Sequence, residues 1–162
     1  MFTLLFIISV ASAQLFGIGV HDNDYVFYVI ADKPYVMRSA EPKANLCNLC
    51  TRSGRDQLIH FRGDEELLPL CYALDGDNPV VVFNTNKQAQ FCDEWDLSAL
   101  PDIRSNGAPI KAVQGKFKGW YLDWSDKEIE VVEDGKTKHV RELILVKEPK
   151  AVRKFWKFPI AP

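Results

Sequence analysis

Residues 80–97, VVVFNTNKQAQFCDEWDL, carry the pattern that decides the fold. A run of β-branched and aromatic residues at 80–83 meets a polar turn at 84–87, and a second amphipathic run closes on Trp95. This order predicts a strand, a turn and a second strand. The same order occurs at 143–156, where the run ends at Trp156, and in a weaker form at 35–47.

The three copies of this pattern lie about fifty residues apart, a spacing typical of folds built from repeated units. The tetrapeptide Glu-Pro-Lys-Ala at 41–44 also recurs at 148–151, inside the first and last copies. Repeated strand–turn–strand units at such a period favour a fold with internal threefold symmetry.

The rest of the chain also predicts strands. Residues 25–30 form an aromatic and β-branched run, and the clearest hairpin joins 129–132 to 140–146 through the turn Glu133-Asp134-Gly135-Lys136. No window of helical length shows a clean 3.6-residue period. About ten to twelve short strands with frequent turns indicate an all-β barrel or sandwich.

Residues 1–13 are expected to be a secretory signal peptide. An apolar run at 4–10 precedes Ala11-Ser12-Ala13, which has the small-x-small pattern of a cleavage site. The run is too short to cross a bilayer. We therefore predict a secreted, extracellular protein with one domain at 14–162, and the alternative is an apolar N-terminal strand of a cytosolic protein.

Composition limits the classes of partner. Hydrophobic residues make up 47% of the chain, which favours a packed globule over disorder. A net charge of −2 gives no reason to expect nucleic acid or an anionic membrane as a partner. We expect a monomer.

The cysteines are Cys47, Cys50, Cys71 and Cys92. In an oxidising compartment an even number of cysteines predicts two disulfides, and three pairings are possible. We expect Cys47 and Cys50 each to bridge to one of the distant pair. The spacing of Cys47 and Cys50 also occurs in zinc and redox motifs, but the chain has no second close pair and no helical pattern after Cys50. We expect no metal.

Enzymatic activity is not expected. His21, His60 and His139 stand far apart in the sequence, and no nucleophile, metal-protease or phosphate-binding motif occurs. Carboxylates beside aromatic residues at 94–96 and 123–124 are the residue types of a glycosidase, but that reaction needs two carboxyl groups facing each other across a cleft. We expect no cofactor.

Four short motifs follow one another in order. They are the aromatic strand at 24–30, the turn and first cysteine at 43–49, Cys92-Asp93-Glu94-Trp95, and Gly119-Trp120-Tyr121-Leu122-Asp123. Their order resembles that of the Kunitz soybean trypsin inhibitor family. The resemblance covers most of 14–162, and it implies a β-trefoil barrel with pseudo-threefold repeats and a loop that inserts into the active site of a target protease.

The chain departs from this family at two places. No cysteine follows Cys92, so the family's usual second disulfide is missing and Cys50 and Cys71 would bridge differently. The position of the reactive loop holds Leu70, Cys71 and Tyr72 without a basic residue, and the nearest cation upstream is Arg62. The resemblance implies protease contacts through these four residues. The alternative is that 67–72 is a core strand in which Cys71 is tied to Cys50.

Carbohydrate binding, or another protein-binding role, is the second functional hypothesis, because a fold does not fix its function. An aromatic ring beside an Asp is a common platform for a sugar, so the candidates for glycan binding are Trp120, Tyr121, Asp123 and Trp124. The alternative is that Trp95, Trp120 and Trp156 fill the core. The Gln-x-Trp triplet of trefoil lectins is absent from the sequence.

Overall fold

The computed structural model describes residues 14–160 except 23, 39–47, 63–65, 78 and 86–93. The expected signal peptide at 1–13 lies outside the described residues. Within the described part the chain is all-β, as expected: it has thirteen strands, one short 3₁₀ helix and no α-helix. None of its helical segments is long and apolar enough to cross a membrane.

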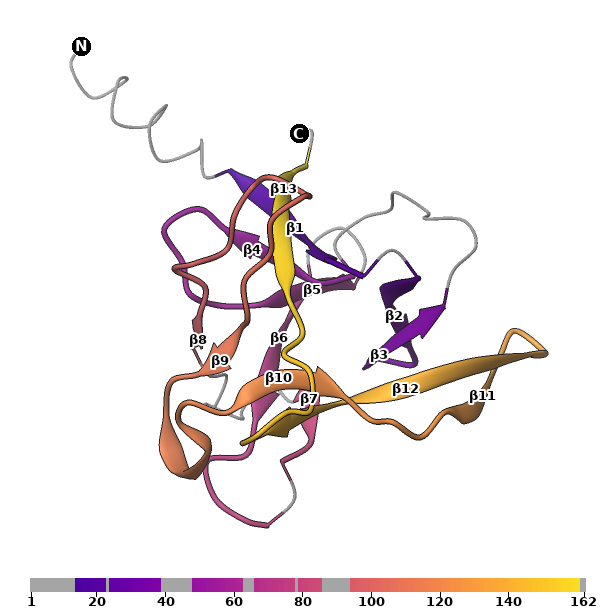
Figure 1. Ribbon diagram of the computed structural model, residues 1–162. Coiled ribbons are helices and arrows are strands. Elements are labelled where there is room, and N and C mark those ends of the chain that lie inside the picture. The colour runs from indigo at the N-terminus through magenta and orange to yellow at the C-terminus, as the bar shows by residue number, and fades with distance from the viewer. Residues whose placement is uncertain are drawn as a thin grey trace.

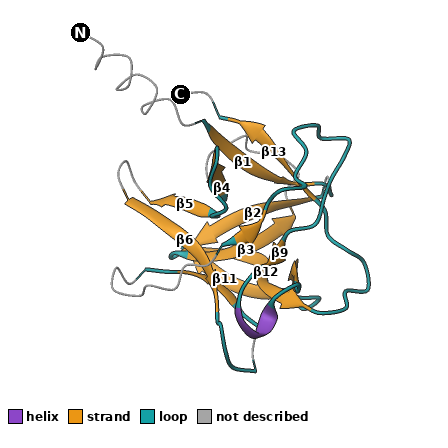
Figure 2. Ribbon diagram, turned by 90° about the vertical axis from the view of Figure 1, so that its left-hand side faces the viewer, coloured by secondary structure: helices purple, strands orange, loops and turns teal. Residues whose placement is uncertain are grey.

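The strands are short and follow one another closely along the chain. They are β1 (Leu15–Val20), β2 (Tyr25–Ile30), β3 (Lys33–Arg38), β4 (Cys50–Arg52), β5 (Ile59–Arg62), β6 (Glu66–Tyr72), β7 (Val81–Phe83), β8 (Trp95–Asp96), β9 (Lys111–Ala112), β10 (Tyr121–Trp124), β11 (Ile129–Glu133), β12 (Lys136–Val146) and β13 (Phe155–Pro159). The 3₁₀ helix η1 (Gly115–Phe117) is drawn in purple in Figure 2.

The strands form two antiparallel sheets (Figure 1). The order in one sheet is β13-β1-β4-β5-β6-β7, and in the other it is β2-β3-β12-β10-β9-β8, with β11 paired to β12. Most neighbours in the sheets are also neighbours in sequence, as is common in antiparallel sheets. The pairings of β13 with β1 and of β3 with β12 bring distant parts of the chain together.

Backbone hydrogen bonds also join the two sheets to each other. The Trp95 amide donates to the Asp56 carbonyl at 2.8 Å, just before β5. Ala108 and Phe155 exchange two bonds at 2.9 and 2.8 Å, so the segment before β9 meets β13. Together with the sheet pairings, these bonds link β1, β4, β5, β8, β9 and β13 in a ring.

The remaining strands form hairpins that pack against one another. The hairpins are β2–β3, β6–β7 and β10–β12, and the connection between the strands of the last one contains β11. Strand β3 pairs with β12, and Val80, just before β7, forms a bridge to Ile144 of β12. The three hairpins are therefore in mutual contact through β12.

The main core lies between the ring and the hairpins and is rich in aromatic residues. Trp95 and Trp124 are its largest fully buried side chains, and the ring of Trp95 meets Tyr72 edge-on at 4.9 Å. Trp120 is only partly buried and Trp156 lies outside this core. Of the expected core set, Trp95 is fully buried in the main core, Trp120 packs against that core while partly buried, and Trp156 is not part of it; Trp124 is the second fully buried tryptophan.

The position of Trp156 follows from two glycines in β1. Gly17 pairs with Phe158, and Gly19 pairs with Trp156. A Cβ atom at position 17 would lie 2.3 Å from the Phe158 ring, and one at position 19 would lie 2.4 Å from the Trp156 indole. The two rings therefore rest on bare glycine backbone, on the face of β13 opposite to the buried Phe155.

The predicted hairpin at 129–146 is confirmed. Strand β11 pairs with β12 from Ile129↔Val140 to Glu133↔Lys136, and Asp134 and Gly135 turn the chain with φ of 52° and 75°. Figure 1 shows this hairpin extending away from the ring as an arm. Its apolar side packs on β2 and β3 in a small second cluster around the buried Ile30, Tyr35 and Val140.

The Tyr28 hydroxyl ties the arm to β2 by donating to the Glu133 carboxylate. This hydrogen bond, together with burial and the negative charge of Glu133, raises the pKa of Tyr28 to about 12. The protonated phenol is the form that the fold favours, and an unfolded tyrosine titrates near pH 10. The stability that this bond contributes is therefore complete below pH ~10 and is lost as the pH rises through ~12.

We expect the free energy of unfolding of the wild type, measured relative to a Tyr28→Phe variant, to fall between pH ~10 and ~12. Below pH ~10 the difference between the two proteins should be constant. Urea unfolding of both proteins across this range measures the difference. A difference that stays the same up to pH ~12 would show that the Tyr28 hydroxyl does not titrate as described.

The described cysteines lie on strands of the first sheet. Cys50 is on β4 and Cys71 on β6, and β5 runs between these strands. Cys50 lies opposite Ile59 and Ile59 opposite Pro69, so the two cysteine Cα atoms are separated by at least two strand spacings, ~9–10 Å, whereas a disulfide needs less than ~7 Å. A direct bridge from Cys50 to Cys71, considered above with the core-strand alternative, does not fit this sheet.

Neither Cys50 nor Cys71 is a free thiol. Cys47 and Cys92 lie outside the described residues, so their pairing stays a prediction.

Candidate protein-binding loop

The residues first expected to contact a protease lie inside the protein. Leu70, Cys71 and Tyr72 are 0%, 6% and 3% exposed, and all three belong to β6 between β5 and β7. Leu70 also accepts a hydrogen bond from the indole of Trp95 at 3.0 Å through its carbonyl. Side chains in such a strand cannot reach a partner while the sheet is intact. The alternative of a core strand therefore describes this segment, and we withdraw these three as contact residues.

Arg62, the fourth residue of that set, lies at the end of β5. Its guanidinium is 2.7 Å from a carboxylate oxygen of Asp32, and the two side chains are 40% and 32% exposed. An ion pair this open to solvent contributes less than about 1 kcal/mol. Arg62 is accessible, but it is engaged with the β2–β3 turn.

An exposed loop that the sequence did not single out joins β4 to β5. All six residues at 52–57 are exposed, and they lie between the buried Thr51 and Leu58. We call residues 52–57 the Arg55 loop. The side chain of Arg55 takes part in no ion pair within the described residues. The loop thus presents a long cation to solvent.

A tight turn shapes the first half of this loop. The Arg55 amide donates to the Arg52 carbonyl at 3.0 Å, and Gly54 has a φ of 76°. That φ lies in the left-handed region, which glycine adopts without the steric cost of a side chain. The Ser53 amide donates to the Gln14 carbonyl at 2.8 Å, which fixes the turn to the start of β1.

The second half of the loop is fixed to the ring. The Asp56 carbonyl accepts the Trp95 amide at 2.8 Å, and the hydroxyl of the buried Thr51 donates to the Arg55 carbonyl at 3.4 Å. The backbone on both sides of Arg55 is therefore held by the protein itself. A loop fixed in this way loses little conformational entropy when a partner binds.

Arg55 is not singled out by the sequence analysis, because the position of the contact loop is taken there from the family resemblance. The signal was nevertheless present: Ser53-Gly54-Arg55-Asp56 is a polar, glycine-containing segment between two apolar runs, which predicts an exposed turn.

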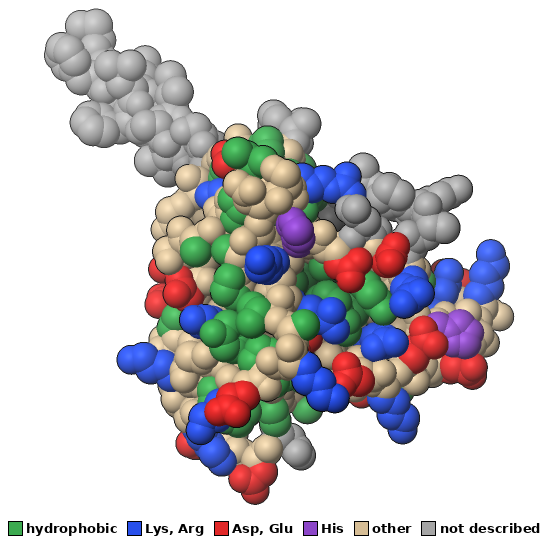
Figure 3. Space-filling model, in the orientation of Figure 1, with side chains coloured by type: hydrophobic (Ala, Val, Ile, Leu, Met, Phe, Trp, Pro, Cys, Tyr) green, Lys and Arg blue, Asp and Glu red, His purple; other side chains and the backbone are tan. Residues whose placement is uncertain are grey.

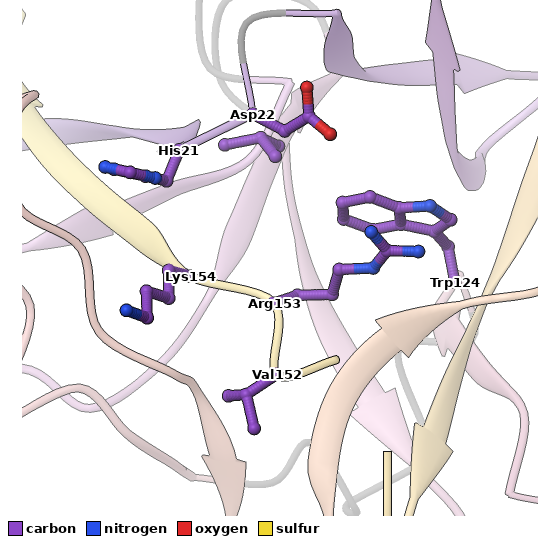
Figure 4. Close-up of a pocket in the computed structure, with 7 residues that line it drawn as sticks. His21, Asp22, Trp124, Val152, Arg153 and Lys154 are labelled. Carbon is purple, nitrogen blue, oxygen red and sulfur yellow. The ribbon is translucent and has the colours of Figure 1, made fainter. Parts of the chain in front are cut away.

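Two of the glycan candidates are buried beneath an arginine. Trp124 is 2% and Asp123 is 9% exposed, and Arg153 lies over the Trp124 ring at 4.0 Å while donating to Asp123 at 3.0 Å. Trp124 and Arg153 border a surface hollow of about 310 Å³ that is also lined by His21 and Lys154. Figure 4 shows Arg153 reaching toward the indole, whereas His21 and Lys154 extend away from it. Arg153, which is already paired with Asp123, therefore covers the Trp124 ring on the side of this hollow.

The other two glycan candidates are engaged elsewhere. Trp120 packs edge-on against Phe117 at 4.8 Å, and the amine of Lys111 lies over the Tyr121 ring at 4.7 Å. The four residues therefore do not form one exposed aromatic platform.

The histidines lie on separate elements. His21 is hydrogen-bonded to the Ser105 carbonyl at 3.2 Å, His60 stacks on Phe83 at 5.2 Å, and His139 lies 3.8 Å from Glu130. No group of three or more His, Cys, Asp or Glu side chains among the described residues is arranged to hold a metal ion. Figure 3 shows acidic and basic side chains interspersed over the arm, so this view has no large patch of one charge there.

Comparison with known proteins gives this chain no relative. No family model, curated protein or solved structure matches it. Its function is therefore inferred from its own residues.

Proposed function

We propose that this protein is a secreted protease inhibitor and that the Arg55 loop is the segment that enters the protease. The observation that carries the proposal is the exposed cation Arg55 on a loop whose backbone is fixed on both sides; Arg52, at the start of the same loop, is exposed as well. Arg55 is exposed, and hydrogen bonds to Gln14, Thr51 and Trp95 hold the residues around it. β6, by contrast, offers no accessible side chain at 70–72.

The proposal includes a β-trefoil fold of the kind found in the Kunitz soybean trypsin inhibitor family. Two features support it. A ring of backbone pairings links six segments, and the three hairpins β2–β3, β6–β7 and β10–β12 pack together through β12. A threefold barrel closed by three hairpins has this organisation.

Two disulfides belong to the same proposal. Cys50 and Cys71 do not bridge each other, so each pairs with Cys47 or Cys92. Cys50 is two residues before the Arg55 loop, so its disulfide would restrain the strand from which the loop emerges. Such a restraint suits a secreted protein whose loop must keep its shape.

The charge of Arg55 defines the class of protease. A guanidinium is a long planar cation that forms paired hydrogen bonds with a carboxylate. Trypsin-like serine proteases have an aspartate at the base of their specificity pocket. Docking would cover about 800 Å² of the inhibitor, with a few residues supplying most of the binding energy. We propose that Arg55 is the main one.

An inhibition assay with a trypsin-like protease tests this function. The wild type should inhibit, and Arg55→Ala should weaken inhibition by at least about thirtyfold, which is the effect of losing a binding hot spot of ~2 kcal/mol. Arg55→Lys should retain part of the inhibition because it keeps the charge.

Lys118→Ala is the matched control. Lys118 is an exposed cation in the turn after η1, outside the Arg55 loop, and its loss should leave inhibition unchanged. Equal inhibition by Arg55→Ala and the wild type would reject the proposed loop. Failure of the wild type to inhibit serine, cysteine and aspartic proteases would reject the function, and retention on a glycan array would then favour carbohydrate binding.

A further inference from the structure

We infer that β11 is a docking edge for an extended segment of another polypeptide, one that places a cation opposite Glu130 and an apolar side chain opposite Val132. β11 is the outer strand of the arm, and within the described residues it pairs with β12 alone. Figure 1 shows the arm extending away from the ring to which the Arg55 loop is fixed. The docking edge is thus separate from that loop and does not rest on the proposed function.

The turn of the arm determines which backbone groups of β11 point outward. The Asp134-Gly135 turn has positive φ at both positions, so the residues on either side of it form a hydrogen-bonded pair. Hydrogen-bonded pairs alternate with non-bonded pairs along an antiparallel ladder. The amide and carbonyl groups of Glu130 and Val132 therefore face away from β12. Among the described residues, no backbone hydrogen bond from another segment reaches them.

The side chains at these two positions leave the edge open. Val132 is 67% exposed, the highest value among the large apolar residues of the described chain, and the Glu130 side chain is 70% exposed. His139 lies 3.8 Å from the Glu130 carboxylate, which is too long for a hydrogen bond. Edge strands are commonly protected by lysine, proline or a bulge. β11 contains neither lysine nor proline, and its register with β12 has no bulge.

The inner side of β11 holds this edge in its extended form. Ile129 and Val131 pack against the second cluster around Val140, and the Tyr28 hydroxyl donates to the Glu133 carboxylate. A strand that is already extended loses little conformational entropy when another strand adds to it. Main-chain hydrogen bonds then supply affinity, and the side chains opposite β11 supply specificity.

The charge of β11 selects the partner. The strand includes Glu130 and Glu133 and contains no cation, and it is flanked by Glu128 and Asp134. Opposite charges on facing residues stabilise a pair of strands, and like charges destabilise it. The partner that fits therefore has Lys or Arg opposite Glu130 and an apolar residue opposite Val132.

A second copy of this chain fits the edge poorly. In an antiparallel pair of two β11 strands, the outward residues of one copy must face the outward residues of the other. Glu130 facing Glu130 opposes two carboxylates directly. Glu130 facing Val132 places Glu128 opposite Asp134, and Val132 facing Val132 places Glu130 opposite Asp134. Each register thus opposes like charges, so the structure favours a basic partner over a second copy.

The test uses a peptide, capped at both ends, with the sequence Thr-Val-Thr-Lys-Thr-Lys-Thr. Lying antiparallel to β11, it presents its valine to Val132 and a lysine to Glu130 on one face. Hydrogen exchange of single amides, followed by NMR on the full oxidised chain, measures the contact. An excess of this Lys peptide should slow exchange of the Glu130 and Val132 amides by at least about fivefold, the effect of one added hydrogen bond each. The Val131 amide, which faces β12, should be unaffected, and a peptide with Glu in place of Lys should have no effect.

Two variants and a control locate the contact. Val132→Pro removes an outward amide, which an edge strand tolerates, and the Lys peptide should no longer protect Glu130. Glu130→Lys keeps the backbone and reverses the charge, so this variant should bind the Glu peptide in place of the Lys peptide. Asp102→Lys makes the same change of charge on an exposed residue before β9, outside the arm, and should bind the Lys peptide like the wild type.

The outcomes separate the edge, the charge and the partner. Unchanged exchange at Glu130 and Val132 in excess Lys peptide would overturn the docking edge. Equal protection by the two peptides, or equal loss of binding in Glu130→Lys and Asp102→Lys, would overturn the role of the Glu130 charge. A wild type that sediments as a dimer, with these two amides already protected, would overturn the choice of partner and assign the edge to a second copy.

Discussion

Replacing Trp95 with alanine is expected to lower the free energy of unfolding by about 4 kcal/mol, within the range seen for buried aromatic residues. The ring is 1% exposed, packs edge-on against Tyr72, and donates its indole N–H to the Leu70 carbonyl. The truncation leaves a cavity in the main core and also removes the partner of a buried carbonyl. Urea unfolding followed by circular dichroism measures the loss.

Trp156→Ala is the comparison for this experiment. The Trp156 ring is partly exposed and rests on Gly19 outside the main core, so its removal should cost less than about half as much. Similar losses for the two variants would show that Trp95 is not at the centre of the packed core.

Replacing Leu70 with aspartate is expected to prevent folding. Leu70 is fully buried in β6, and the change puts a carboxyl group among apolar side chains with no partner for its charge. The penalty exceeds about 5 kcal/mol, which is comparable to the whole stability of a small domain. Near-ultraviolet circular dichroism and exclusion chromatography of the purified variant measure whether a packed state forms.

Val82→Asp provides a matched control on the adjacent strand. Val82 lies on β7 opposite Cys71 and is 44% exposed, so its new carboxylate stays in water. Its effect should be within about 0.5 kcal/mol. A folded Leu70→Asp protein, or an unfolded Val82→Asp protein, would contradict the orientation of the β6–β7 hairpin.

Local sequence patterns were sufficient for the fold class. In β7 the buried Val81 and Phe83 alternate with the exposed Val82, which is the period of two expected of a strand. The Asp134-Gly135 turn likewise predicted the β11–β12 hairpin, because Asp followed by Gly is a pair that readily adopts the left-handed φ values of a two-residue turn.

Burial on the individual strands was harder to predict. Trp120, Leu122 and Trp124 alternate along the sequence, a pattern typical of a strand with one buried face. In the structure Asp123 is buried as well, because Arg153, thirty positions away, neutralises it. Trp120 lies before β10 and packs on the 3₁₀ turn. The burial of these residues depends on partners that are distant in the sequence, and a local sequence pattern holds no information about such partners.

The same reason explains the error in the contact loop. Whether 67–72 forms a loop or a central strand depends on β5 and β7 lying on either side of it, which the segment's own residues do not specify. Arg55 is exposed because β4 ends at Arg52 and the chain does not rejoin the sheet until Ile59. Both outcomes are set by pairing between strands.

The hydrogen bond from the Trp95 amide to the Asp56 carbonyl has a further consequence. One end of it belongs to the most deeply packed tryptophan, and the other belongs to the loop proposed to meet a partner. A substitution that disturbs the packing around Trp95 is therefore also expected to alter the conformation of the Arg55 loop. If the loop binds a protease as proposed, a substitution that destabilises the core around Trp95 should also weaken that binding.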